Sequence, residues 1–92
     1  MVARQIRVSG RVQGVGYRVA LQLAAREHRV SGWVRNRSDG SVEALLQGST
    51  QAVEALIAWA RRGPPGASVV DVAVTAMEEQ PAHAGFELRA TL

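Results

Sequence analysis

The segment best suited to chemistry is GRVQGVGYR, residues 10–18, which lies between a strand pattern and a helix pattern. Gly14 and Gly16 allow successive backbone amides to turn inward without Cβ clashes, which forms an anion-binding concavity. The helix that follows adds free amides and a dipole that favour an anion at its N-terminus. Arg18, on the first turn of that helix, can reach two phosphate oxygens with its guanidinium. The segment therefore predicts a phosphate or carboxylate site that needs no metal.

Two other interpretations of this loop are possible from residues alone. A glycine-rich turn between a strand and a helix is often an ordinary connector without a ligand. A nucleotide loop fits poorly, because a Walker A motif requires lysine and the chain has none. A dinucleotide fingerprint that began at Gly14 would require glycine at position 19, where Val19 stands. The anion site and the plain connector remain the alternatives.

Length and composition limit the class of protein. A chain of 92 residues is long enough for one domain, residues 1–92, with a single core. All 11 basic residues are arginines, which raise the isoelectric point to 11.0 although the net charge is only +3. Because these arginines are scattered, we expect no nucleic-acid partner. Cysteine is absent, which excludes disulfides and cysteine-ligated zinc.

Neither a membrane-spanning run nor a signal peptide is visible in the sequence. No apolar stretch approaches the roughly 20 residues that span a bilayer, and residues 1–8 lack the apolar core of a secretory signal. We therefore expect no membrane partner and a cytoplasmic location. No sequence feature encodes the oligomeric state, and we expect a monomer.

Hydrophobic periodicity predicts the elements that must position the loop. Strands are expected at residues 4–9, 30–36, 41–48, 70–76 and 86–89. Helices are expected at 19–28 and from a cap at Ser49 or Thr50 to Gly63. The order is βαββαβ with a short extra C-terminal strand. Two right-handed crossovers would place both helices on one face of a mostly antiparallel sheet, which is an α+β, ferredoxin-like sandwich.

Longer motifs carry a resemblance to a known family. Residues 10–18, GRVQGVGYR, resemble the first signature of the acylphosphatases, and residues 32–48, GWVRNRSDGSVEALLQG, resemble the second. The segments RRGPPGASVVDV and GFELRAT are also similar to that family. The likeness covers nearly the whole chain, and it implies the ferredoxin-like fold that the periodicity predicts independently.

The resemblance implies hydrolysis of a small-molecule acyl phosphate to a carboxylate and inorganic phosphate, without a cofactor or metal. It implies that Asn36 holds the attacking water and that Arg18 binds the phosphate with the loop. The loop residues that would contact the phosphate are Gln13, Gly14, Val15, Gly16, Tyr17 and Arg18. A carboxylate leaves easily because the pKa of its conjugate acid is about 4, so no general acid is required. Phosphoryl transfer then depends mainly on positioning and charge stabilisation.

Two other functions share parts of this pattern. An RNA recognition module has the same βαββαβ order, but it stacks bases on aromatic residues of its central strands, and residues 41–48 contain none. A ligand-sensing domain could keep the phosphate loop without turnover, which would leave Asn36 without a role. Arg35 and Arg37 flank Asn36, and they either add positive potential near it or lie on a solvated strand face.

One position departs from the family pattern. A glycine is expected after the first helix, where a left-handed C-cap is natural, but Arg29 stands there. If its backbone has a positive φ, the arginine costs about 1 kcal/mol.

Overall fold

Five strands and two helices follow one another in the predicted order. The structure, a computed structural model, describes residues 1–78 and 81–92. Its elements are β1 Val2–Arg11, α1 Tyr17–Glu27, β2 Ser31–Asn36, β3 Val42–Gly48, α2 Thr50–Arg62, β4 Ser68–Met77 and β5 Phe86–Leu88. Neither helix of the described part of the chain is long and apolar enough to cross a membrane.

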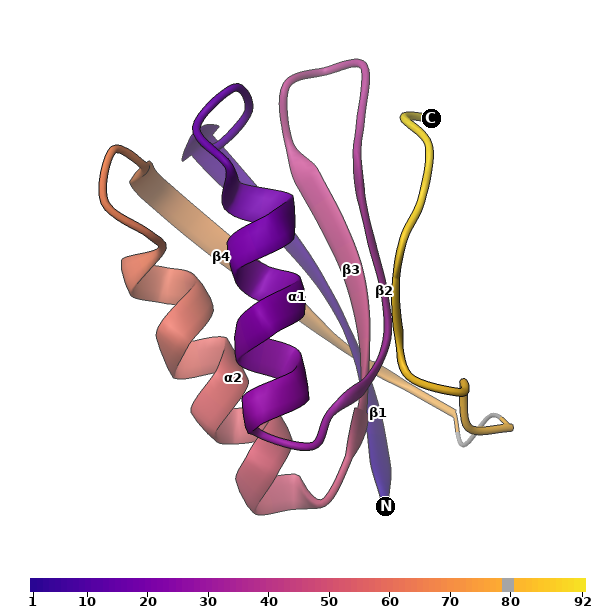
Figure 1. Cartoon of the computed structure of the whole chain (residues 1–92). Coiled ribbons are helices and arrows are strands. Elements are labelled where there is room, and N and C mark those ends of the chain that lie inside the picture. The colour runs from indigo at the N-terminus through magenta and orange to yellow at the C-terminus, as the bar shows by residue number, and fades with distance from the viewer. Residues whose placement is uncertain (79–80) are drawn as a thin grey trace.

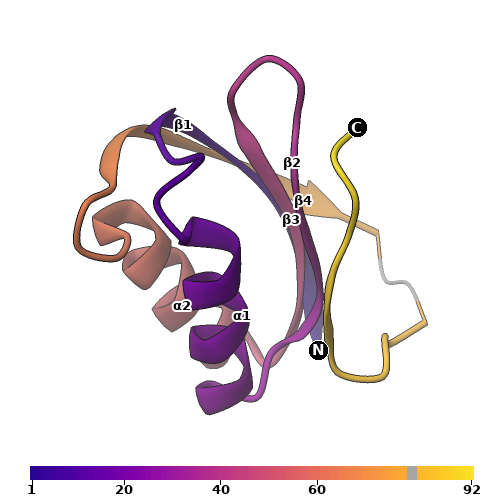
Figure 2. The same ribbon diagram turned by 45° about the horizontal axis from the view of Figure 1, so that its top comes forward.

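The strands form one sheet in the order β4-β1-β3-β2-β5. β1 pairs antiparallel with β3 and β4, β2 pairs antiparallel with β3, and only the short β5 runs parallel to its neighbour β2. Both helices lie against the same face of this sheet (Figure 1), and a second view shows the opposite face without a helix over it (Figure 2). The predicted ferredoxin-like sandwich is confirmed.

The core lies between the helices and the sheet. Alternation along β1 buries Ile6 and Val8 completely, and they pack with Leu46 of the central strand. Leu21 of α1 and Leu56 of α2 are equally inaccessible and close the layer from the other side. Burial of apolar surface therefore holds the helices on the sheet. Because the loop before α1 is attached to one of these helices, its C-terminal end is held in place as well.

Helix α1 begins two residues before its predicted start at residue 19, because Tyr17 is a core residue. Its side chain is 1% exposed, and its hydroxyl donates to the carbonyl of Ala60 on α2 at 2.8 Å. Burial raises the pKa of the Tyr17 phenol. The contact anchors the first turn of α1 directly after the loop.

Strand β1 is longer than its alternation predicts. It continues to Arg11, and its pairing with β4 shifts register between Ser9 and Gly10. An irregularity of this kind interrupts the two-residue period, which is why the pattern ends at Ser9 in the sequence.

The expected departure at the end of α1 is present. Arg29 has φ 57°, a left-handed conformation that glycine adopts with less strain. The next amide, that of Val30, donates to the carbonyl of Ala25 at 2.8 Å and closes the helix end.

Candidate active site

Three segments that are distant in the sequence meet at one end of the molecule. They are the loop of residues 12–16, hereafter the phosphate loop, the β2–β3 turn of residues 37–41, and the C-terminal residues (Figure 1). A small cavity of about 150 Å³ lies there. Its lining consists of Val12, Gln13, Gly14, Gly16, Tyr17, Arg18, Val19 and Asn36.

The backbone of the phosphate loop alternates in hand. Gly14 has φ 73° and Gly16 has φ 77°, whereas Val15 between them keeps a negative φ. Alternation of this kind turns neighbouring amides toward one side and forms a concavity for an anion. A Cβ at either glycine would meet no atom within 4 Å, so the positive φ rather than lack of space favours glycine there.

The first turn of α1 adds further amides. Gly16 is the N-cap residue, and no side chain caps the helix. Ala20 makes the first helical hydrogen bond, to the carbonyl of Gly16 at 3.0 Å. Within residues 1–78 and 81–92, the amides of residues 13–19 have no hydrogen-bond acceptor. They are therefore free for an anionic ligand at the positive end of the helix.

Arg18 reaches this cavity from α1. Its Nη1 donates to the carbonyl of Arg89 at 3.3 Å, so one edge of the guanidinium is held by the C-terminal segment. A guanidinium has five N–H donors, and the remaining ones are available to a second acceptor.

Asn36 enters the cavity from the end of β2. β3 separates β1 from β2 in the sheet, so the two strands are not neighbours. The phosphate loop nevertheless lies in the same cavity lining as Asn36. The side-chain oxygen of Asn36 is buried and has no hydrogen-bond partner among the described residues. A buried unpaired oxygen is costly unless a ligand or water satisfies it, so this carboxamide is suited to hold one.

The side chains of three loop residues that the resemblance assigns to phosphate binding make contacts elsewhere. The Gln13 side chain is directed to the β2–β3 turn, where its Nε2 donates to the carbonyls of Arg37 and Ser41. The Tyr17 ring lies in the core, and Val15 packs against the core instead of lining the cavity. For Gln13 and Tyr17, the backbone amide is therefore the group that a phosphate could contact.

Arg35 and Arg37 have a role that the sequence pattern did not reveal. Arg35 Nε and Arg37 Nη1 donate to Oε1 of Glu43 at 2.7 and 3.1 Å, and Arg7 Nη2 lies 3.5 Å from Oε2. The Glu43 side chain is only 4% exposed. Burial alone would raise the pKa of Glu43, but hydrogen bonds from Arg35 and Arg37 lower it below its ordinary value. The guanidiniums of Arg35 and Arg37 are therefore directed to Glu43, and neither residue lines the cavity.

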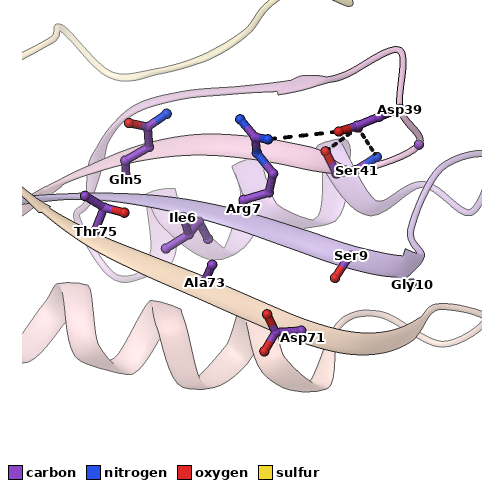
Figure 3. Close-up of a pocket in the computed structure, with 11 residues that line it drawn as sticks. Gln5, Ile6, Arg7, Ser9, Gly10, Asp39, Ser41, Asp71, Ala73 and Thr75 are labelled. Atoms are coloured by element: carbon purple, nitrogen blue, oxygen red, sulfur yellow. Dashed lines mark hydrogen bonds and ion pairs between the residues drawn. The ribbon is translucent and has the colours of Figure 1, made fainter.

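A larger hollow of about 620 Å³ lies along β1, β4 and the β2–β3 turn. Figure 3 shows Gln5, Arg7, Asp71 and other polar side chains around it. Nη1 of Arg7 lies 4.0 Å from Oδ2 of Asp39. It contains none of the free loop amides and neither Arg18 nor Asn36. We therefore take the smaller cavity as the candidate active site. In the described part of the chain, no group of three or more His, Cys, Asp or Glu residues could hold a metal ion.

The chain is similar to known proteins of one family. Residues 4–88 match the family model of the acylphosphatases. A protein of Acidiphilium cryptum named acylphosphatase is 50% identical to this chain over 99% of both chains. Another so named, from Thermococcus kodakarensis, is 48% identical over 95% of this chain and 94% of its own. The crystal structure of acylphosphatase from Bacillus subtilis is similar with a TM-score of 0.94 and 37% identity, covering 97% of this chain and 99% of that one.

Proposed function

The chain belongs to the acylphosphatase family, and we propose that its small cavity hydrolyses acyl phosphates to a carboxylate and inorganic phosphate. It is an acylphosphate phosphohydrolase, a hydrolase acting on acid anhydrides. One observation carries the assignment of the site: free loop amides, a guanidinium and a carboxamide without an internal partner converge on one cavity.

In this proposal the phosphate loop and Arg18 hold the phosphoryl group. The amides of residues 13–18 donate to its oxygens, with Gln13 and Tyr17 contributing through the backbone. The guanidinium of Arg18, supported by Arg89 on one edge, donates to two oxygens with the other. These donors are fixed before substrate arrives, so they stabilise the charge that spreads over the phosphoryl oxygens in the transition state.

Asn36 orients the nucleophile. Its carboxamide hydrogen-bonds a water molecule opposite the acyl oxygen, so that the water oxygen lies in line with the bond that breaks. The water oxygen forms a bond to phosphorus, the phosphorus–acyl oxygen bond breaks, and one proton of the water passes to a phosphoryl oxygen, so that the product is dihydrogen phosphate. The carboxylate leaves with its electron pair and needs no protonation, since the pKa of its conjugate acid is about 4. Orientation of the reactants then supplies much of the acceleration.

We also propose that the protein works as a cytoplasmic monomer, without a metal or other cofactor. The chemistry supports the absence of a cofactor requirement, because a good leaving group and fixed donors leave little for a metal to add. Sedimentation of the purified protein at several concentrations would show the oligomeric state.

The proposed activity is tested with purified protein and benzoyl phosphate in excess EDTA. We expect release of phosphate well above the spontaneous rate, with inorganic phosphate as a competitive inhibitor. Phenyl phosphate, a monoester with a poorer leaving group, should be hydrolysed far more slowly. Turnover no faster than the spontaneous rate, or turnover abolished by EDTA, would contradict the proposal.

A further inference from the structure

The two halves of the candidate site come from different segments. The phosphate loop belongs to the β1–α1 connection, whereas Asn36 ends β2 and precedes the turn of residues 37–41. β3 separates the two strands, so they share no ladder of hydrogen bonds and are connected only through their pairing with β3. A direct contact between the phosphate loop and the β2–β3 turn would fix the distance between the loop amides and the Asn36 carboxamide more closely than this indirect pairing does.

Gln13 provides such a contact from within the phosphate loop. Its Nε2 donates to the carbonyl of Arg37 at 2.7 Å and to the carbonyl of Ser41 at 2.9 Å. The same two carbonyls close the turn, because they accept from the amides of Gly40 and Arg37 at 3.1 and 2.9 Å. Gln13 is thus hydrogen-bonded to the base of the turn, next to Asn36.

The position of Asn36 depends on its backbone. The buried oxygen of its carboxamide has no partner among the described residues, so no hydrogen bond to that atom holds the side chain. The backbone itself is held on one side by pairing with Val42 and on the other by the amide of Leu92, which donates to the Asn36 carbonyl at 3.1 Å. Neither of these contacts involves the phosphate loop.

We propose that Gln13 is a positioning residue, which fixes Asn36 relative to the phosphate loop through the carbonyls of Arg37 and Ser41. The inference rests on the proposed function, and it concerns the side chain of Gln13, not its backbone amide. A primary amide suits this role, because its nitrogen carries two protons and both are directed to carbonyl oxygens.

The proposed role requires a hydrogen-bond donor at the end of the side chain of residue 13, and it therefore predicts how substitutions there will behave. Methionine preserves approximate length but has no donor. Glutamate preserves shape, yet its ionised carboxylate would face two carbonyl oxygens and be repelled. A protonated glutamate has one O–H donor and can restore one of the two bonds. The activity of Gln13→Glu should therefore recover as the pH falls.

The first experiment compares Gln13→Met with wild type and with Gln22→Met. Gln22 is a matched control, because its Nε2 also donates to a backbone carbonyl, that of Phe86 at 2.8 Å, but it does not link the two halves of the site. With benzoyl phosphate, Gln13→Met should lose about 10²-fold in kcat, the scale expected for a displacement of about 1 Å. Its dissociation constant for inorganic phosphate should change less than threefold, and Gln22→Met should retain the wild-type kcat. A kcat of Gln13→Met within twofold of wild type overturns the proposal.

The second experiment records the ratio of kcat for Gln13→Glu to that of wild type between pH 4 and 7. The ratio should rise at least fivefold as the pH falls and the carboxylate takes up a proton, since facing two carbonyls raises the pKa of this new group. Hydrogen bonds from Ser41 hold the pKa of Asp39, in the same turn, below its ordinary value, so Asp39 remains ionised over most of this range. A ratio independent of pH contradicts the positioning role. This test also remains informative if Gln13→Met does not fold.

Failure of this inference can be distinguished from failure of the proposed function. If wild type hydrolyses benzoyl phosphate and the Gln13 variants do so equally well, only the inference is wrong. If wild type shows no turnover, the function is wrong, and the inference is then decided by nuclear magnetic resonance. The side-chain amide signals of Asn36 should move in Gln13→Met and stay in place in Gln22→Met, and unchanged signals in both overturn it.

Discussion

The guanidinium of Arg18 donates to the main-chain carbonyl of Arg89 at 3.3 Å, which joins the first turn of α1 to the C-terminal segment. The amide of Arg89 in turn donates to the carbonyl of Val34 at 2.8 Å, so this segment is bound to β2, the strand that ends at Asn36. The phosphate-binding group and the water-binding group thus share one support. This arrangement suggests direct tests of both residues.

Replacement of Arg18 by lysine should remove most phosphate binding and reduce kcat/KM by about 10²–10³-fold, the usual loss for one transition-state donor. An ammonium is a point charge and cannot form two parallel hydrogen bonds to phosphate oxygens. Steady-state kinetics and phosphate titration measure both effects. Arg26→Lys, an exposed change in the last turn of the same helix, is the control. Near-normal kinetics of Arg18→Lys would contradict its assigned role.

Replacement of Asn36 by alanine should separate binding from turnover. The phosphate donors lie on the loop and on Arg18, so the dissociation constant for phosphate should remain close to that of wild type. Loss of the group that orients water should lower kcat by about 10²–10³-fold. Ser38→Ala, at an exposed position of the adjacent turn, serves as the control. Retained turnover in Asn36→Ala would favour a different water-binding group.

Local pattern and motif spacing predict much of the fold. Alternation and helical spacing correctly predict five strands and two helices in order, and the Ser49 cap and Gly63 stop bound α2 as expected. The early start of α1 was missed because Tyr17 is held by a contact with Ala60, 43 residues away. A long-range contact of this kind has no signature in a short window of sequence.

The sequence predicts most of the residues that line the small cavity, but not the direction of their side chains. The loop residues and Asn36 follow from motifs, and the structure brings all of them except Val15 into one cavity lining. The sequence could not show that the Gln13 side chain contacts the turn, because its two acceptors lie 24 and 28 residues away along the chain. Glu43 was also missed, although its alternation with apolar residues on β3 and the arginines on β2 offered a signal for a buried ion pair.

The buried Glu43 should make the free energy of unfolding decrease as the pH falls into the acid range. Its pKa is lower in the folded protein than its ordinary value of 4.5, so its contribution is complete above that value and is lost as the pH falls below it. The free energy of unfolding of wild type should therefore decrease more between pH 6 and 3 than that of Glu43→Gln. At neutral pH, Glu43→Gln should cost about 1–3 kcal/mol, since it removes charge-assisted hydrogen bonds to partly exposed arginines.

Urea unfolding monitored by tryptophan fluorescence measures this effect. Glu87→Gln is the control, because Glu87 is paired with Arg89 in an exposed ion pair and should change stability by less than about 1 kcal/mol. Equal acid sensitivity of wild type and Glu43→Gln would show that Glu43 does not contribute in the way described.

Replacement of Arg29 by glycine should stabilise the protein by about 1 kcal/mol. The φ of 57° at Arg29 is strained for a residue with a Cβ, and glycine removes that strain. Thermal and urea unfolding give the change, and kcat should be unaffected because Arg29 lies outside the cavity lining. Arg26→Gly, inside α1, should instead destabilise by about 1 kcal/mol. A loss of stability in Arg29→Gly would indicate that the arginine side chain makes a compensating contact.

The most direct test of the proposed mechanism follows the oxygen of the attacking water. Hydrolysis of benzoyl phosphate in ¹⁸O-enriched water should place one ¹⁸O atom in the inorganic phosphate and none in the benzoate, because Asn36 directs water to the phosphorus held by Arg18 and the phosphate loop. Mass spectrometry of both products reads the outcome after correction for spontaneous hydrolysis. Label in the benzoate carboxylate would mean that water attacks the carbonyl carbon, which contradicts the proposed roles of Arg18 and Asn36.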